Sequence, residues 1–493
     1  ENYIPHRHEE GYGVNVDGIE KLAKGGAKLI VTVDSGITDV EPIARANELE
    51  IEVIVTDHHL PQEKLPDAFA ILNPNARADE TYPFKSLCGS GVAWKLVCAT
   101  ISLMRDSSPT SPRLRRATEL PHGWEKWLLD MVGLATIADM VPLIDENRLL
   151  AKYGLLVMRK SPRIGLQKMC RGMRVEQRAI TEDDIGFMIA PRVNAASRMG
   201  DARDAFTLFT TTDEDEADML AKKLEKANRS RKAEAGAITR AVHTRIKERG
   251  GDMRSVIALG DPEWRPALLG LVAGNIADEF ERPVFLWGRE GNNSLKGSFR
   301  SGGSTQVMEL MRTTENMFAQ FGGHAAAGGF TLIDTEVFFL EDRLVLALRS
   351  LGEEGSAHSQ DTLEMRADAI LTPEEINKSY LIKVEKLAPF GIANPKPMFL
   401  LRDVSVREIS RFGKGEEHLK IKIAVNDDGD TIDAVTFFVK GSTARVASTL
   451  TRGSRVNLLA HLERDTFSRP ALRSLGGVGG NPVRLRLLDI RLV

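Results

Sequence analysis

Residues 28–36 read Lys-Leu-Ile-Val-Thr-Val-Asp-Ser-Gly, and residues 51–59 read Ile-Glu-Val-Ile-Val-Thr-Asp-His-His. Both stretches are β-branched runs of strand length that end in polar residues. The residues between them predict a helix over about 41–49, with Thr38 and Glu41 spaced as a capping box at its start. A strand, a helix and a strand joined by short connections form a βαβ unit with parallel strands. The sequence therefore predicts an α/β fold.

Composition narrows the class of protein. The chain has 493 residues, of which 42% are hydrophobic and 27% charged, which suggests about three folded domains and excludes a disordered chain. It contains no apolar run of the roughly 18 residues that a transmembrane helix needs. Three cysteines (Cys88, Cys98 and Cys170) fit neither a disulfide framework nor a zinc site and indicate reduced thiols in a cytoplasmic protein. The net charge of −3 does not indicate a strongly basic nucleic-acid binder, although a basic cleft can occur on an acidic protein.

Four segments differ in pattern along the chain. Residues 1–211 start as α/β and become mostly helical, and residues 212–250 are charged, alanine-rich and typical of one long connecting helix. Residues 251–350 return to an α/β pattern. After a linker at 351–360, residues 361–493 alternate apolar and polar positions, which predicts a small barrel or sandwich of short antiparallel strands. The Ser/Pro/Arg-rich stretch at 106–119 predicts an exposed loop.

Acidic and histidine side chains follow the two predicted strands. Asp34 ends the first strand, and Asp57, His58 and His59 end the second. The carboxyl ends of parallel strands open onto the binding crevice of an α/β sheet, so these side chains predict a site for Mg²⁺ or Mn²⁺, and the imidazoles favour Mn²⁺. Asp139 lies in the apolar stretch 133–143, where a carboxylate has to be paired, capped or metal-bound.

These residues resemble the motifs of the DHH phosphoesterase family, and most closely those of its RecJ-like members, which are exonucleases specific for single-stranded DNA. The first resemblances are Val-Thr-Val-Asp34-Ser-Gly, Val-Thr-Asp57-His58-His59 and Ile-Ala-Asp139-Met-Val-Pro-Leu. Further matches occur in the same order along the chain, at residues 4–7, 11–13, 87–95, 191–198, 296–301, 321–324 and 389–395. Because the matching motifs are ordered and span nearly the whole chain, the resemblance is specific.

The resemblance implies an architecture: a parallel-sheet DHH domain, a long helix, a second α/β domain (the DHH-associated domain) and an OB-fold barrel. It implies that Asp34, His58 and Asp139 are metal ligands, and that Asp57 and His59 act beside them as ligand, supporting residue or phosphate contact. The expected phosphate and DNA contacts are Arg7, Arg198, Ser298, Arg300 and His324. An OB-fold binds single strands through a basic groove and stacking aromatic rings. The candidate DNA contacts on the expected OB-fold are Phe399, Arg411, Phe412, Lys414, Lys420, Lys422 and Phe437.

The family's first motif, Asp-x-Asp-Gly on a preceding strand, is absent from the chain. We therefore expect an N-terminally incomplete DHH domain, and two metal ions only in the complete protein. The leading hypothesis is a metal-dependent 5′-to-3′ exonuclease of bacterial DNA recombination and repair. Such an enzyme is expected to act on single-stranded DNA with a 5′ end and to work with a helicase and a single-strand-binding protein. The alternatives are a phosphodiesterase for short oligonucleotides or cyclic dinucleotides, and a non-catalytic single-strand-binding scaffold.

Overall fold

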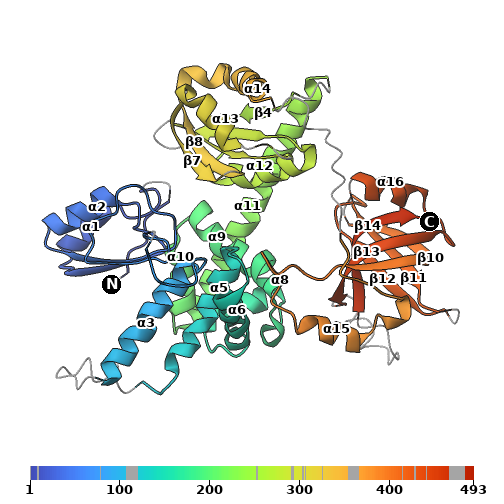
Figure 1. Ribbon diagram of the computed structural model, residues 1–493, viewed down its shortest axis with the longest axis horizontal. Coiled ribbons are helices and arrows are strands. Elements are labelled where there is room, and N and C mark those ends of the chain that lie inside the picture. The colour runs from blue at the N-terminus through green and yellow to red at the C-terminus, as the bar shows by residue number, and fades with distance from the viewer. Residues whose placement is uncertain are drawn as a thin grey trace. The chain divides into compact units, whose positions relative to one another are not determined.

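The computed structural model describes residues 2–7, 10–77, 79–106, 120–250, 254–289, 294–302, 305, 307–324, 326–352, 366–413, 415–426, 429–439, 441–465 and 483–493 (Figure 1). The chain forms two compact units. The first contains Glu1–Asp139 and Tyr153–Asp361, and the second contains Met140–Lys152 and Thr362–Val493. The loop predicted at 106–119 and the linker predicted at 351–360 fall almost entirely outside the described residues.

The first unit begins with a three-stranded parallel sheet. Its strands are β1 (Leu29–Val33), β2 (Glu52–Thr56) and β3 (Ala70–Leu72), hydrogen-bonded in that order. Helices α1 (Val16–Lys24) and α2 (Val40–Glu48) share an apolar core with the sheet, in which Ile19, Ile43 and Val53 are almost completely buried. The predicted βαβ unit and its parallel strands are confirmed.

The predicted capping box of α2 is wrong. The residue before the helix is Asp39, one position later than predicted, and its side chain makes no capping bond. Its Oδ2 instead accepts a hydrogen bond from the backbone N–H of Val14 at 2.9 Å. The side chain of Asp39 therefore binds the backbone of Val14, in the loop before α1, instead of capping α2.

A helical region follows, in which a 35-residue helix, α11 (Glu214–Glu248), is the longest element described. Ala217, Leu220 and Leu224 are its buried positions on the side that faces α7, α9 and α10. The other elements of this region are α3 (Gly89–Asp106), η1 (Trp124–Leu128), α5 (Leu129–Ala138), α6 (Asp145–Met158), α7 (Ile164–Met173), η2 (Gln177–Ala179), α8 (Glu182–Asp184), the π-helix η3 (Ile185–Ile189), α9 (Ala190–Met199) and α10 (Arg203–Thr210).

The first unit ends in a five-stranded sheet with the order β4-β5-β6-β8-β7. Strands β4 and β5 are parallel, and the remaining pairs are antiparallel. Helix α12 packs against β5, β6 and α11. The second α/β domain is thus present, built from β4 (Ile257–Gly260), α12 (Pro266–Phe280), β5 (Val284–Arg289), β6 (Leu295–Arg300), α13 (Val307–Thr313), η4 (Glu315–Met317), β7 (Phe318–His324), β8 (Ala327–Leu332), η5 (Asp334–Phe338) and α14 (Leu340–Ser350).

The second unit is a β-barrel. Its sheet has the order β11-β12-β14-β13-β10-β9, and the additional pairing of β10 with β11 closes the ring of β10 to β14. The predicted OB-fold barrel is confirmed, but its strands are not all antiparallel, because β12 pairs with β14 and β9 with β10 in parallel. Its elements are β9 (Ala369–Ile370), η7 (Pro373–Glu375), α15 (Lys378–Glu385), β10 (Phe399–Phe412), β11 (His418–Ala424), β12 (Thr431–Thr436), α16 (Gly441–Thr449), β13 (Arg455–Arg464) and β14 (Val483–Leu492).

Two expectations from composition can be compared with the structure. Cys88, Cys98 and Cys170 are free thiols, and burial raises the pKa of Cys170 to about 11. Among the helices of the described ranges, none has both the length and the apolar character to cross a membrane.

Candidate metal and phosphate sites

The carboxyl ends of the three parallel strands carry the polar residues that form the candidate site. Asp34 directly follows β1, Asp57 follows β2, and Asn73 follows β3. The backbone N–H of Asp34 still donates to the carbonyl of Thr56 at 2.9 Å, so Asp34 is held at the end of the β1–β2 ladder. Its φ of 62° turns the chain sharply there. The sheet edge therefore gathers residues from three separate parts of the sequence.

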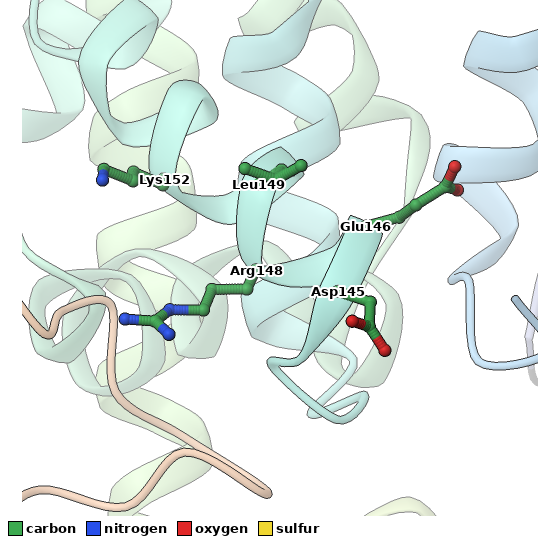
Figure 2. A pocket seen from close by; sticks show the side chains of 5 residues that line it. All are labelled: Asp145, Glu146, Arg148, Leu149 and Lys152. Carbon is green, nitrogen blue, oxygen red and sulfur yellow. The ribbon is translucent and has the colours of Figure 1, made fainter.

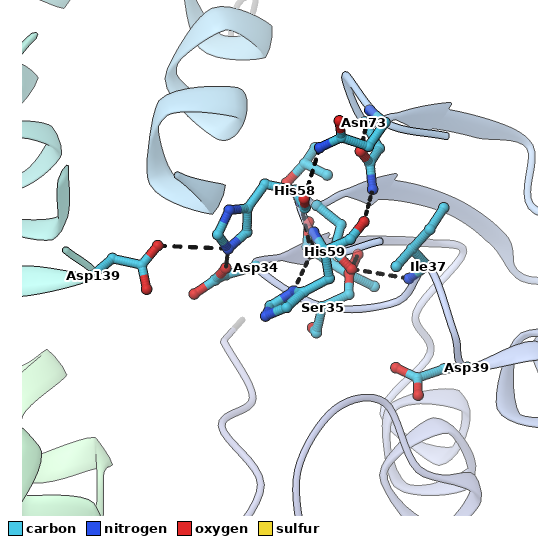
Figure 3. A network of polar contacts seen from close by, with 12 residues as sticks. Asp34, Ser35, Ile37, Asp39, His58, His59, Asn73 and Asp139 are labelled. Atoms are coloured by element: carbon cyan, nitrogen blue, oxygen red, sulfur yellow. Dashed lines mark hydrogen bonds and ion pairs between the residues drawn. The ribbon is translucent and has the colours of Figure 1, made fainter. Parts of the chain in front are cut away.

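His58 lies between two carboxylates (Figure 3). Its Nε2 is 3.1 Å from Oδ1 of Asp34 and 3.6 Å from Oδ2 of Asp139, which is the C-terminal cap of α5. Ligand atoms of Asp34, His58 and His59 also lie within 4.8 Å of one another. Carboxylate oxygens with imidazole nitrogens at this spacing fit a small divalent cation such as Mn²⁺. The three predicted metal ligands, Asp34, His58 and Asp139, are thus brought together.

The electrostatics of this group agree with a cation site. Burial raises the pKa of Asp139, against the opposing charge of His58. Burial alone would lower the pKa of His58, but its hydrogen bond to Asp34 and the charges of Asp34 and Asp139 outweigh that effect and raise it. Two carboxylates that face one imidazole leave an excess of negative charge, which a divalent cation can neutralise.

Asp57 has a different environment. It is almost completely buried, and its Oδ2 accepts a hydrogen bond from the backbone N–H of Ile37 at 3.0 Å. Its Oδ1 accepts from the backbone N–H of His58 at 2.7 Å and contacts Nδ1 of His59, also at 2.7 Å. Burial would raise the pKa of Asp57, but these hydrogen bonds lower it. Both oxygens of Asp57 are therefore engaged with donors of the protein itself.

Two asparagines after β3 complete the support of the histidines. Asn73 Nδ2 donates to the carbonyl of His59 at 2.9 Å, and Asn75 Nδ2 donates to the carbonyl of His58 at 3.0 Å. The sequence analysis missed both residues. The available signal was their position after a third short apolar run, Ala70–Leu72, where a third parallel strand end would be expected.

Gly89 was also missed as a site residue, although it lies within the matching motif at 87–95. It is the first residue of α3, and a Cβ built on it would lie 2.4 Å from Oδ1 and 2.6 Å from Cα of Asp34. Because atoms do not approach that closely, only glycine allows α3 to begin beside Asp34.

The loop near the N-terminal end is held to the same edge. Arg7 stacks on the ring of Tyr12, with its guanidinium carbon 4.3 Å from the ring centroid. Gly13 has a φ of 78°, and a Cβ there would lie 2.9 Å from Oδ2 of Asp39. Burial raises the pKa of Asp39, and the charge of Asp57 adds to this. Gly13 is therefore packed against the start of α2, whereas Tyr12 is 71% exposed.

A second group of site residues is basic. Arg198 on α9 donates from Nη1 to the carbonyl of Ala267 on α12 at 2.7 Å. Ser298 and Arg300 alternate along β6, so they share one face of that strand. A Cβ at Gly270 on α12 would lie 2.7 Å from Nη2 of Arg300 and 3.4 Å from Oγ of Ser298. The predicted phosphate contacts Ser298 and Arg300 thus meet at one place, beside α12, which Arg198 also reaches.

Arg231 on α11 is a basic residue that the sequence analysis missed. Burial lowers the pKa of Arg198, and burial together with the charge of Arg198 lowers the pKa of both Arg231 and Arg300. The guanidinium of Arg231 is held by Oδ1 of the buried Asn228, at 3.3 Å from Nε and 3.0 Å from Nη2. Two partly buried cations that each lie within the field of a third, Arg198, form an environment suited to an anion.

The other predicted DNA contacts differ in whether they are described and in how they are paired. His324 ends β7, and its side chain is outside the described part of the structure, as is Lys414. On the barrel, Phe412 and Arg411 are exposed. Lys420 pairs with Asp433 at 2.5 Å and Lys422 with Glu408 at 2.6 Å, so both ammonium groups are neutralised on the surface.

The structure contradicts the predicted DNA contact at Phe399. It is 4% exposed and belongs to the core of the barrel, where it packs against the ring of Tyr380. The β10 strand starts with its apolar face turned inward at this position. A ring in the core presents no face to a DNA base, so the predicted contact is wrong for this residue.

A shallow pocket on α6 lies apart from the matching motifs. Its lining residues are Asp145, Glu146, Arg148, Leu149 and Lys152 (Figure 2). They come from little more than two turns of one helix and mix acidic with basic side chains. Arg148 donates from Nη2 to the carbonyl of Leu387 at 2.7 Å. The pocket therefore offers no convergent set of catalytic groups.

Comparison with known proteins agrees with this arrangement. Three family models match: the DHH family N-terminal domain at residues 1–132, the DHHA1 domain at 253–349 and the RecJ OB domain at 367–470. The single-stranded-DNA-specific exonuclease RecJ of Escherichia coli is 34% identical over 447 residues, which cover 88% of this chain and 75% of that protein. The Bacillus subtilis protein of the same name is 32% identical over 462 residues, 93% of this chain and 55% of the relative.

A solved RecJ structure is also similar to this chain. RecJ of Thermus thermophilus in complex with Mn²⁺ superposes with a TM-score of 0.73 at 26% identity, over 97% of this chain and 63% of that protein. A second structure of that protein contains Mg²⁺. The chain therefore spans a little more than half of the Bacillus subtilis relative and under two thirds of the Thermus thermophilus structure. With motifs, site geometry and three domain matches in agreement, the chain belongs to the RecJ family of DHH phosphoesterases.

Proposed function

We propose that this chain carries the catalytic machinery of a metal-dependent exonuclease that hydrolyses single-stranded DNA from 5′ to 3′ in recombination and repair. The observation that carries the proposal is the meeting of Asp34, His58 and Asp139, which come from three separate motifs, at one sheet edge. The names of the RecJ relatives support the substrate class. A helicase and a single-strand-binding protein are the partners we propose for it.

The donor set fits Mn²⁺ or Mg²⁺. We assign Asp34, His58 and Asp139 as ligands, with His59 close enough to join them. When bound, such a cation lowers the pKa of a water molecule and offsets negative charge on the phosphoryl oxygens. We propose that the enzyme uses two ions, since a paired site can stabilise both the attacking and the leaving oxygen.

Asp57 acts as a positioning residue in this proposal. Its Oδ1 accepts from Nδ1 of His59, which leaves Nε2 of the neutral ring as the nitrogen that can bind a cation. The same carboxylate fixes the backbone of His58 and of Ile37. Asp57 therefore aligns both histidines without contacting the substrate.

The basic group holds the strand. Arg198 and Arg300 present planar guanidinium forks, which can each donate two parallel hydrogen bonds to a phosphate, and Ser298 adds a hydroxyl beside Arg300. We propose that Arg7 and His324 add further contacts to the DNA end. Tight holding of the strand places one phosphodiester bond at the sheet edge, where reaction becomes effectively unimolecular.

The test of the proposal is direct. We expect progressive shortening of 3′-labelled, 5′-phosphorylated single-stranded DNA in the presence of Mn²⁺. Shortening should be lost in His58→Ala and after addition of a chelator. Binding without any shortening would contradict the enzyme and favour the scaffold.

Substrate length separates the exonuclease from a phosphodiesterase for short oligonucleotides. We expect kcat/KM to be higher for a 20-nucleotide strand than for a dinucleotide, because contacts beyond the cleaved bond add binding energy. Equal or better hydrolysis of the dinucleotide would favour the alternative. Arg300→Ala should weaken binding of the 5′-phosphorylated strand and leave the affinity for Mn²⁺ unchanged, which separates the strand contacts from the metal ligands.

A further inference from the structure

The last of the matching motifs forms a tight loop between α15 and β10, for which the proposed function gives no role. The backbone N–H of Gly391 donates to the carbonyl of Asn394 at 2.9 Å, and the N–H of Asn394 donates back to the carbonyl of Gly391 at 3.1 Å. Nδ2 of Asn394 also donates to the carbonyls of Leu387 at 3.2 Å and Pro389 at 2.7 Å. Asn394 therefore ties the loop together. We call residues 387–395 the anchor loop.

The anchor loop binds the part of the chain that follows the proposed metal ligand Asp139. The backbone N–H of Leu143 donates to the carbonyl of Ile392 at 2.7 Å. Arg148, in the first turns of α6, donates from Nη2 to the carbonyl of Leu387, also at 2.7 Å. Both acceptors belong to the anchor loop. The loop thus holds this part of the chain at two points, and the first of them is only four residues after Asp139.

The packing at the first of these points is close. Leu143 is almost completely buried, and a Cβ built on Gly391 would lie 2.8 Å from Cδ1 and 3.3 Å from Cγ of Leu143. Carbon atoms do not approach that closely, so a side chain at position 391 would push Leu143 away. Glycine in the anchor loop therefore allows the backbone hydrogen bond and the packing of Leu143 to form together.

The backbone between Asp139 and Leu143 is strained. Met140 has a φ of 57°, a left-handed conformation that residues other than glycine rarely adopt, and its side chain is exposed. Such a conformation persists only where the structure on both sides imposes it. Before Met140, the N–H of Asp139 donates to the carbonyl of Ala135 at 2.8 Å, at the end of α5. After it, the anchored Leu143 supplies the second constraint.

We propose that the anchor loop positions Asp139 for metal binding and that Asn394 is the positioning residue that keeps the loop closed. The proposal rests on the proposed function, in which Asp139 is a ligand of the cation. Met140–Lys152 belongs to the same compact unit as the loop, although Asp139 belongs to the other unit. If the loop opens, Leu143 loses its acceptor and the strained turn relaxes. The carboxylate of Asp139 then loses its fixed direction toward His58. Asn394 acts through this connection and contacts neither the cation nor DNA.

The first experiment measures the Kd of the full chain for Mn²⁺ by isothermal titration. Asn394→Ala removes both side-chain hydrogen bonds of the loop and should raise this Kd at least about tenfold, because loss of a residue that orients a metal ligand typically costs about 10- to 100-fold. In hydrolysis it should lower kcat and leave KM for single-stranded DNA unchanged, since the strand contacts stay in place. A general loss of barrel structure would instead raise KM.

Two further sets of variants separate positioning from stability. Asn457→Ala is the matched control, because Oδ1 of Asn457 accepts from the backbone N–H of Asp403 at 2.9 Å, a bond of the same kind in the barrel that lies outside the anchor loop. It should keep the wild-type Kd for Mn²⁺. Arg148→Met removes the second point of contact and should weaken Mn²⁺ binding. Arg148→Lys, whose ammonium group can still donate to the carbonyl of Leu387, should restore it.

Amide hydrogen exchange, recorded with a chelator present, tests the anchor loop without any metal. Asn394→Ala should speed exchange at the amides of both Leu143 and Asp139, and Asn457→Ala should not. Faster exchange at Leu143 alone would make the loop a structural contact that does not reach the ligand, and would overturn the proposal. An unchanged Kd for Mn²⁺ in Asn394→Ala would overturn it too. If the wild type binds no Mn²⁺, the metal site of the proposed function fails, and exchange at Asp139 still decides whether the loop positions that residue.

Discussion

At the scale of single residues, the position of Asp34 depends on a glycine elsewhere in the chain. A Cβ at Gly89 would lie 2.5 Å from Cβ and 2.6 Å from Cα of Asp34, so either α3 or the metal ligand has to move. Because displacement of a metal ligand or of its support typically costs about 10- to 100-fold, Gly89→Ala should lower the affinity for Mn²⁺ by at least about tenfold. Isothermal titration with Mn²⁺ measures this loss.

Gly172 provides the matched control for that substitution. It lies within α7, and no atom lies within 4 Å of a Cβ built on it. Gly172→Ala should leave the affinity for Mn²⁺ unchanged and stabilise the protein by about 0.5–1 kcal/mol, because alanine loses less backbone entropy in a helix. Equal Mn²⁺ affinity of the two variants would show that Asp34 tolerates a side chain at position 89.

At the scale of secondary-structure elements, the sequence predicts the strands that show apolar periodicity and the site residues that directly follow a strand. Alternating or β-branched runs located β1, β2, β11 and β12, and the strand ends placed Asp34 and His58 together. The start of α2 and the burial of Phe399 were predicted wrongly, because both depend on contacts distant in sequence. The end of the third apolar run marks the position of Asn73 and Asn75, but the groups that they and Gly89 contact are distant in sequence and are brought to them only by the fold.

One ionic group holds several helices of the first unit together. Asp130 on α5 is 2% exposed, and its Oδ2 accepts from Ser161 Oγ at 2.7 Å and from Arg163 Nε at 2.8 Å. Arg163 also donates from Nη1 to the carbonyl of Phe209 on α10 at 2.9 Å. Because removal of Asp130 leaves the partly buried guanidinium of Arg163 without its carboxylate, Asp130→Ala should lower the free energy of unfolding by about 3 kcal/mol. Urea denaturation followed by circular dichroism measures it.

An exposed ion pair is the comparison for Asp130. Asp218 and Lys222 face solvent one turn apart on α11, with 2.5 Å between Oδ2 and Nζ. Asp218→Ala should leave the urea midpoint of the first unit unchanged, since water and salt screen such a pair. Similar midpoints for the two variants would mean that the Asp130 group does not stabilise the helical region.

At the scale of the whole molecule, net charge is a poor guide to the ligand. The chain carries a net charge of −3, yet Arg198, Arg231 and Arg300 are partly buried cations, and the charge of Arg198 adds to burial in lowering the pKa of the other two. A local concentration of positive charge can attract a polyanion even when the protein as a whole is acidic. The dependence of DNA affinity on salt reports how many phosphates are neutralised, with a slope of about −0.7 per phosphate on a single strand.

Arg231→Ala should therefore reduce the slope of log K against log[salt] by about 0.7, because one phosphate contact is removed. The affinity for Mn²⁺ should stay unchanged, since Arg231 contributes to the basic group and not to the metal ligands. Arg229→Ala is the matched control: Arg229 lies on the same helix but pairs in solvent with Glu225, with its Nε 2.7 Å from Oε1. It should keep the wild-type slope. If both variants keep that slope, α11 connects the two α/β domains without contributing to the binding of the strand.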